Sequence, residues 1–206
     1  MRKGKQLWLI AGGNGAGKST FYRTQLEPLG LPFINADILA KQLYPDEPEQ
    51  HSYEAARIAG TMRNKLLQEG RSFCFETVFS HPSKIDFIAQ ARSMGYEVIL
   101  VFIHLDNISL NQARVSQRVS EGGHHVPENK VSSRVPKVLQ NIKQVLGLCN
   151  QSYLLDNSRL DNPFKQIAEI HDGQLTAKVT ALPDWAQGLL RVSASKSTPL
   201  TLSGDY

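Results

Sequence analysis

The chain has 206 residues, of which 41% are hydrophobic and 20% charged, and its net charge is +4. This composition can supply the core of one α/β domain, which we expect to span residues 1–192, followed by a flexible tail over residues 193–206. The longest strongly apolar run, residues 98–103, is far shorter than the roughly 20 residues that a membrane span needs.

Two further features bear on the compartment. The basic N-terminus runs straight into an apolar segment without a small-residue cleavage site, so we do not expect a signal peptide. Cys74 and Cys149 lie far apart in apolar settings, which indicates buried, reduced thiols rather than a disulfide or a metal site. The sequence therefore predicts a cytoplasmic protein with no membrane attachment.

The first predicted element is a buried strand over residues 7–11, since a continuous apolar run is typical of parallel strands. It leads into a motif with the G-x-x-x-x-G-K-S pattern of Walker A, comprising Gly12, Gly13, Asn14, Gly15, Ala16, Gly17, Lys18, Ser19 and Thr20. The backbone N–H groups of such a loop surround a phosphate chain at the start of a helix. Lys18 can then reach the β- and γ-phosphates, and the Ser19 hydroxyl can ligate Mg²⁺. The motif predicts binding of ATP or GTP together with Mg²⁺.

Strand and helix signals alternate along most of the remaining chain. In chain order we predict a helix over 19–26, a strand over 32–35, helices over 38–44 and 52–68, a strand over 72–75, a helix over 84–94, a strand over 97–105, a helix over 107–120, a helix over 128–148 interrupted near Pro136, and a strand over 151–155. A β-hairpin over 164–180 with an Asp-Gly turn and a helix over 183–191 follow. This order predicts an α/β fold, a P-loop NTPase with a mostly parallel five-stranded sheet, helices on both faces and a C-terminal hairpin.

Acidic residues follow four of these strands, at the edge of the sheet where α/β proteins bind ligands: Asp37, Glu76, Asp106 and Asp156. A carboxylate beside a γ-phosphate either accepts the proton of the attacking hydroxyl or helps to hold Mg²⁺. We expect all four to border one crevice with the Walker loop.

Each of these acids also has a structural explanation. Asp37 could cap the helix that starts after it, and Asp106 with Asn107 forms a natural helix N-cap. Asp156-Asn157-Ser158 suits a turn or a cap. Glu76 needs a polar partner or a ligand, because an unpaired carboxylate at the end of an apolar strand is costly.

The excess positive charge lies between Arg114 and Lys143, where six basic residues accompany two acidic ones. We predict that this segment is a lid that closes over the transferring phosphates. Its proposed parts are the arginines Arg114 and Arg118 on one helix face, Arg134, and a hinge at Gly122-Gly123. The alternatives are a solvated basic face and a nucleic-acid surface, although the segment lacks the aromatic residues of a stacking stripe.

Several linked motifs, in order, resemble the zeta toxin family, and in particular its small bacterial P-loop kinases. They are the Walker motif, Asn35-Ala36-Asp37, Phe75-Glu76-Thr77, residues 114–124, Val126-Pro127 and Asp156-Asn157-Ser158, and the resemblance covers roughly residues 6–172. It implies a nucleotide-kinase-like fold and phosphorylation of the sugar 3′-hydroxyl of UDP-N-acetylglucosamine.

The resemblance also implies roles for single residues. Asp37 would be the general base, and Lys18 and Ser19 would hold phosphates and Mg²⁺. The remaining implied positions are Asn35, Glu76 and Thr77 near the acceptor, and Arg118 and Arg134 as phosphate clamps.

The sequence thus predicts an ATP- or GTP-dependent phosphotransferase whose acceptor is a small molecule, such as a nucleotide sugar. An antitoxin protein would be a further partner, although no part of this chain identifies one. One alternative is a P-loop kinase that acts on another small molecule or on a nucleic-acid end. A second alternative is a regulatory module that binds nucleotide without turnover, which an ATP-hydrolysis assay would distinguish.

Overall fold

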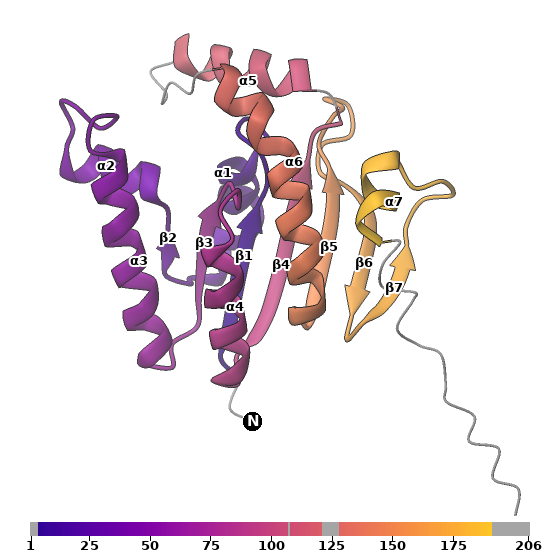
Figure 1. The fold of residues 1–206 in the computed structure, drawn as a ribbon, viewed down its shortest axis with the longest axis horizontal. Coiled ribbons are helices and arrows are strands. Elements are labelled where there is room, and N and C mark those ends of the chain that lie inside the picture. The colour runs from indigo at the N-terminus through magenta and orange to yellow at the C-terminus, as the bar shows by residue number, and fades with distance from the viewer. Residues whose placement is uncertain (1–3, 107, 121–127, 191–206) are drawn as a thin grey trace, which may run out of the picture.

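The computed structural model describes residues 4–106, 108–120 and 128–190. The predicted tail, Asn107 and the proposed hinge at Gly122-Gly123 lie outside these ranges. Within them the chain forms one sheet with helices on both faces (Figure 1).

The sheet has seven strands in the order β2-β3-β1-β4-β5-β6-β7. Their bounds are Phe33–Ile34 (β2), Phe73–Thr77 (β3), Gln6–Ala11 (β1), Glu97–His104 (β4), Gln151–Asp156 (β5), Lys165–His171 (β6) and Gln174–Ala177 (β7). The first five strands in this order are parallel, as predicted. The predicted hairpin is β6–β7, and it extends the same sheet because β6 pairs antiparallel with β5.

The helices alternate with the strands in the predicted order. They are α1 (Lys18–Phe21), which continues through the π-helix η1 (Tyr22–Leu26) and the 3₁₀-helix η2 (Glu27–Leu29), then α2 (Ala36–Leu43), α3 (Ser52–Gln68), α4 (Ser83–Ser93), α5 (Ile108–Ser120), α6 (Glu128–Val145), the 3₁₀-helix η3 (Leu146–Leu148) and α7 (Asp184–Leu190). The predicted interruption near Pro136 is wrong, because α6 runs through this proline. A proline removes one backbone hydrogen bond, and burial of Val138, Ile142 and Val145 beneath the helix offsets that loss.

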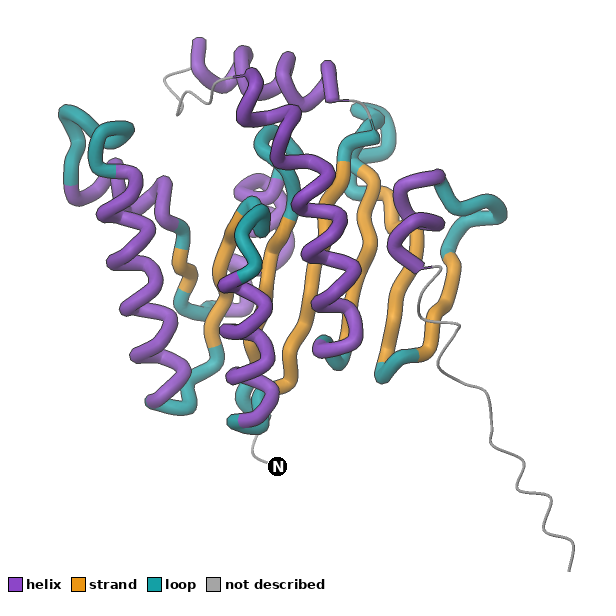
Figure 2. The backbone as a smooth tube through the Cα atoms, viewed as in Figure 1, coloured by secondary structure: helices purple, strands orange, loops and turns teal. Residues whose placement is uncertain are grey.

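The two faces of the sheet are covered unequally (Figure 2). On one face α3, α4, α6 and α7 pack over the larger apolar cluster, which includes Leu9, Phe75 and Leu100. On the other face α1 and η1 cover a smaller cluster that includes Ile10 and Val101. Helix α5 lies across the carboxyl ends of the strands, so it borders the edge at which a ligand would bind (Figure 1).

Both cysteines are buried free thiols, as predicted. Burial raises the pKa of Cys149 to about 12, and burial together with the charge of Glu76 raises the pKa of Cys74. Both groups therefore stay protonated at neutral pH and are poor nucleophiles. None of the helices in the described ranges is long and apolar enough to cross a membrane.

Candidate active site

The loop between β1 and α1 requires glycine at the positions where it approaches other backbone and side chains. Gly12 has φ 154°, and a Cβ there would lie 2.2 Å from the carbonyl oxygen of Ile103 on β4. Gly17 has φ 93°, and a Cβ there would lie 2.6 Å from Nδ2 of Asn157. These clashes explain why the Walker pattern needs glycine here.

Two buried asparagines brace this loop from outside it. Asn157 Nδ2 donates a hydrogen bond to the Ala16 carbonyl oxygen at 2.9 Å, and Asn111 Nδ2 donates to the Asn14 carbonyl oxygen at 2.8 Å. Neither role follows from the sequence pattern, in which Asn157 suits a turn or a cap and Asn111 carries no local signal. A buried amide directly after β5 is the feature that could have pointed to Asn157.

The Walker lysine and serine meet a carboxylate from the neighbouring strand. Lys18 Nζ donates to the Gly13 carbonyl oxygen at 2.9 Å and lies 3.8 Å from Glu76 Oε1. Ser19 Oγ donates to Glu76 Oε2 at 2.8 Å. Parallel pairing of β1 with β3 sets Glu76 beside Ile10, just before the loop. Its carboxylate therefore lies at the phosphate end of the site.

The structural alternative for Asp37, a cap on the following helix, does not hold. Helix α2 begins at Ala36, and Asn35 is its N-cap, with Oδ1 accepting from the backbone N–H groups of Asp37 and Ile38 at 2.8 and 3.2 Å. The Asn35 Nδ2 also donates to Glu76 Oε2 at 2.8 Å. Among the described residues the Asp37 carboxylate has no hydrogen-bond partner, so its oxygens can accept a proton or a hydrogen bond from a ligand.

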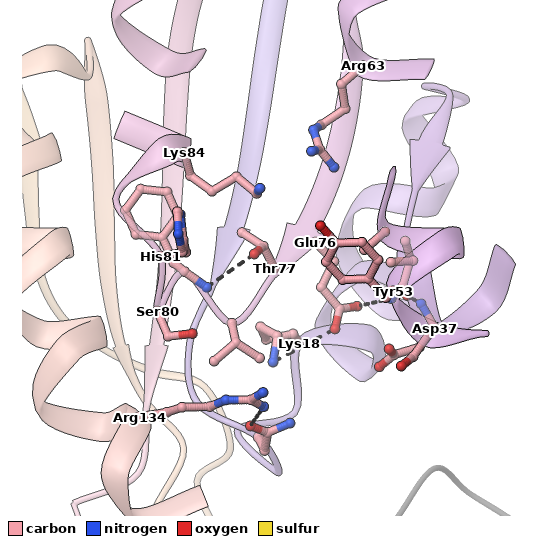
Figure 3. Close-up of a pocket in the computed structure, with 17 residues that line it drawn as sticks. Lys18, Asp37, Tyr53, Arg63, Glu76, Thr77, Ser80, His81, Lys84 and Arg134 are labelled. Carbon is pink, nitrogen blue, oxygen red and sulfur yellow. Dashed lines mark hydrogen bonds and ion pairs between the residues drawn. The ribbon is translucent and has the colours of Figure 1, made fainter. Parts of the chain in front are cut away.

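A pocket of about 400 Å³ opens beside the loop (Figure 3). Seven residues that the sequence had singled out line it: Asn14, Lys18, Asn35, Asp37, Glu76, Thr77 and Arg134. The Thr77 hydroxyl accepts from the Phe79 backbone N–H at 3.1 Å, which fixes the turn that follows β3. The pocket thus adjoins the Walker lysine and presents Asp37 and Glu76 to one space.

The other two acids do not line this pocket, so the prediction of one crevice bordered by all four is wrong. Asp156 Oδ1 accepts from the Ser158 backbone N–H at 2.8 Å and from its hydroxyl at 2.5 Å, which confirms the interpretation as a turn. The Asp106 backbone N–H donates to Ser158 Oγ at 2.9 Å. Asp106 follows β4 and Asp156 is the last residue of β5. Both strands lie on one side of β1, whereas the pocket lies on the other side, next to β3 and β2.

The basic segment is only partly described. Arg134 on α6 lines the pocket, and its Nη1 donates to Asn14 Oδ1 at 3.2 Å. Arg114 on α5 lies beside the Walker loop, with its Cβ 3.4 Å from where a Cβ on Gly15 would be, and it does not line the pocket. The side chain of Arg118 lies outside the described part of the structure. The lid stays a prediction.

The loop, the parallel sheet and the adjoining pocket define a P-loop protein with a kinase-like α/β fold. The chain belongs to the AAA domain family, whose model matches residues 7–140. An uncharacterized protein of Haemophilus influenzae is 29% identical over 137 residues, which cover 63% of this chain and 97% of that protein.

Three solved structures share the fold at low sequence identity. The first is the AvrRxo1-ORF1:AvrRxo1-ORF2 complex with sulphate ions, with a TM-score of 0.70 and 19% identity over 86% of this chain and 62% of that chain. This chain therefore spans about three fifths of that relative's length. The second is a chain in the structure of the PezAT chromosomal toxin–antitoxin system of Streptococcus pneumoniae, with a TM-score of 0.64 and 15% identity over 93% of this chain and 85% of that chain. A putative kinase of Chloroflexus aurantiacus has a TM-score of 0.59 and 16% identity over 78% and 90%.

Proposed function

We propose that the protein transfers the γ-phosphoryl group of ATP or GTP to a hydroxyl group of a small acceptor. The observation that carries the proposal is the pocket itself, which joins the Walker lysine Lys18 to the carboxylate of Asp37 within one space of about 400 Å³. A loop that only held nucleotide would need no second compartment lined by an acid without a hydrogen-bond partner in the described structure.

The phosphate end of the site would hold the nucleotide and Mg²⁺. Lys18 would contact the β- and γ-phosphates. The Ser19 hydroxyl and the Glu76 carboxylate, which lie 2.8 Å apart, are oxygen donors of the kind that Mg²⁺ prefers, so these residues fit the ion. When bound, Mg²⁺ neutralises charge on the β- and γ-oxygens.

Asp37 would act as general base at the acceptor end. The acceptor hydroxyl oxygen bonds to the γ-phosphorus while its proton moves to an Asp37 oxygen. The bond from the γ-phosphorus to the β–γ bridging oxygen breaks, and ADP or GDP leaves with that electron pair. Arg134, held on Asn14, would stabilise charge on the transferring group, and Arg118 would join it in the lid.

UDP-N-acetylglucosamine is the first acceptor to test, because Asn35-Ala36-Asp37 and Phe75-Glu76-Thr77 resemble zeta toxin motifs. Asn35, Glu76 and Thr77 all line the pocket, which supports a place for Asn35 and Thr77 near the acceptor and for Glu76 between the acceptor and Mg²⁺. The fold likeness to a chain of the PezAT toxin–antitoxin system supports an antitoxin as a partner.

The test is incubation with γ-labelled ATP or GTP and Mg²⁺ across a panel of nucleotide sugars, simple sugars and oligonucleotide 5′ ends. Label in a small acceptor that disappears in Asp37→Asn, with nucleotide binding kept, supports the proposal. Label only in oligonucleotides favours a nucleic-acid-end kinase, and nucleotide binding with no transfer and no hydrolysis favours a regulatory module.

A further inference from the structure

Two cations line the same pocket away from the Walker loop. Arg63 projects from α3 and Lys84 from α4, and in Figure 3 both reach into the pocket from the end opposite Arg134. The Arg63 side chain is buried, with 9% of its surface exposed. Its guanidinium lies 5.1 Å from the ring centroid of Phe75 and 5.7 Å from that of Phe87.

Neither cation is neutralised within the described structure. The buried Nε of Arg63 has no hydrogen-bond partner, and none of the ion pairs among the described residues includes Arg63 or Lys84. Glu76, the acid of the pocket on β3, is already engaged by Lys18, Ser19 and Asn35. A buried charge without a partner is costly, and a second cation beside it adds to that cost.

The helix pattern shows that Arg63 is out of place for a purely structural residue. The buried positions of α3 are Ala55, Ala59, Arg63, Leu66 and Leu67, which form one stripe at helical spacing. A hydrophobic residue at position 63 would stack on Phe75 and Phe87 without the desolvation penalty. Burial lowers the pKa of Arg63, and burial and the charge of Arg63 lower the pKa of Lys84. The surroundings of both side chains therefore disfavour positive charge that no anion compensates.

We propose that Arg63 and Lys84 bind an anionic group, a phosphate or a carboxylate, carried by the phosphate acceptor. The site would hold the acceptor with its hydroxyl directed toward Asp37, while Lys18 and Ser19 keep the nucleotide phosphates at the other end of the pocket. This inference rests on the proposed function only in identifying the ligand as the phosphate acceptor. The binding of an anion at this site does not depend on turnover. Its forked donors make Arg63 suited to a planar carboxylate or a phosphate, with Lys84 as a second point charge.

Direct binding tests the anion site apart from catalysis. With the Walker loop filled by a non-hydrolysable ATP analogue and Mg²⁺, calorimetric titrations would compare inorganic phosphate, glucose 1-phosphate, glucuronate, glucose, UDP-N-acetylglucosamine and N-acetylglucosamine. We expect charged compounds to bind more tightly than their neutral counterparts. Arg63→Met and Lys84→Met should each weaken that binding by about tenfold or more, as for a hydrogen bond to a charged group.

The matched control is Lys65→Met, which removes an exposed lysine two residues along the same helix and outside the pocket. Circular dichroism would verify folding, and Lys84→Met serves if Arg63→Met does not fold. With an identified acceptor, the KM for that acceptor should rise in both pocket variants, and the KM for ATP should stay the same. Phosphate-bearing and carboxylate-bearing compounds, tested side by side, show which anion the site takes.

The outcomes separate the two proposals. Arg63-dependent anion binding without any phosphoryl transfer keeps the anion site and refutes the kinase. Transfer to neutral and charged acceptors alike, with KM unchanged in both variants, keeps the kinase and refutes the anion site. If none of the charged compounds shows saturable binding, the anion site is also refuted.

Discussion

Replacing Asn157 with alanine tests whether the Walker loop depends on a brace from outside the motif. The substitution removes the 2.9 Å bond from Nδ2 to the Ala16 carbonyl oxygen and the 3.2 Å bond in which Oδ1 accepts from the Phe164 backbone N–H. Asn157 is 6% exposed and its bond to Ala16 is buried, whereas its bond with the Phe164 N–H is only partly buried. An unsatisfied buried group costs about 1–3 kcal/mol, which gives about 2–6 kcal/mol for two such groups. Since the Phe164 N–H can regain contact with water, we expect the free energy of unfolding to fall by about 2–5 kcal/mol.

The same substitution should weaken nucleotide binding. Gly17 and Ala16 would no longer be held in their phosphate-binding arrangement, and ordering them on binding would cost about 1–2 kcal/mol, or about five- to thirtyfold in Kd for Mg·ATP. Urea denaturation and titration with a fluorescent ATP analogue measure the two effects. Asn162→Ala, at an exposed position of the following loop, is the control. Unchanged stability and unchanged ATP affinity in Asn157→Ala would refute the idea of a brace.

Four further changes probe the rest of the site. Lys18→Ala should abolish tight ATP binding or turnover, because it removes the charge that meets the β- and γ-phosphates; a nucleotide titration measures this. Asp37→Asn should keep stability and ATP affinity and lower phosphoryl transfer by about 10²–10⁴-fold. If it loses stability while activity per folded molecule holds, Glu76 becomes the leading candidate for the base. Arg134→Ala should lower turnover, on the order of 10³-fold for an arginine aimed at transferring charge, far more than it weakens ATP binding; equal losses would indicate a static phosphate contact. Burial lowers the pKa of His104 to about 4 against the opposing charge of Asp156, so the unfolded chain binds a proton that the folded chain does not between pH 6.5 and 4. The free energy of unfolding should therefore fall by about 3 kcal/mol as the pH falls through that window, and denaturation of His104→Phe should lack this component.

Local sequence signals predicted the elements well where the chemistry is itself local. The Walker glycines, the apolar run before them and the helical spacing of residues 52–68 each reflect contacts within a few positions, and α3 has the predicted bounds. The Asp-Gly turn is similar, since Asp172 and Gly173 both have positive φ, as a tight hairpin turn requires. Such features can be predicted because they do not depend on the order of strands.

The errors concern features that only the packed sheet decides. Asn35 and Asp37 are both acceptable N-caps by residue type, and the choice of Asn35 follows from its second bond to Glu76 on a neighbouring strand. Pro136 normally ends a helix, but the buried positions that follow it keep α6 on the sheet. Arg63 was not predicted at all, because a single sequence does not reveal that a buried helix position faces a pocket.

The strand order explains why four acids at strand ends divide into two pairs with different roles. Strands β3 and β2 lie on one side of β1 and bring Glu76 and Asp37 to the pocket beside Lys18. On the other side, β5 ends in Asp156, which turns back onto Ser158, while the neutral amide of Asn157 supports the loop. A carboxylate in place of that amide would face the Ala16 carbonyl oxygen and add negative charge behind the phosphate site. The support of the loop is therefore uncharged on one side of β1, and the acids that would meet Mg²⁺ and the acceptor lie on the other.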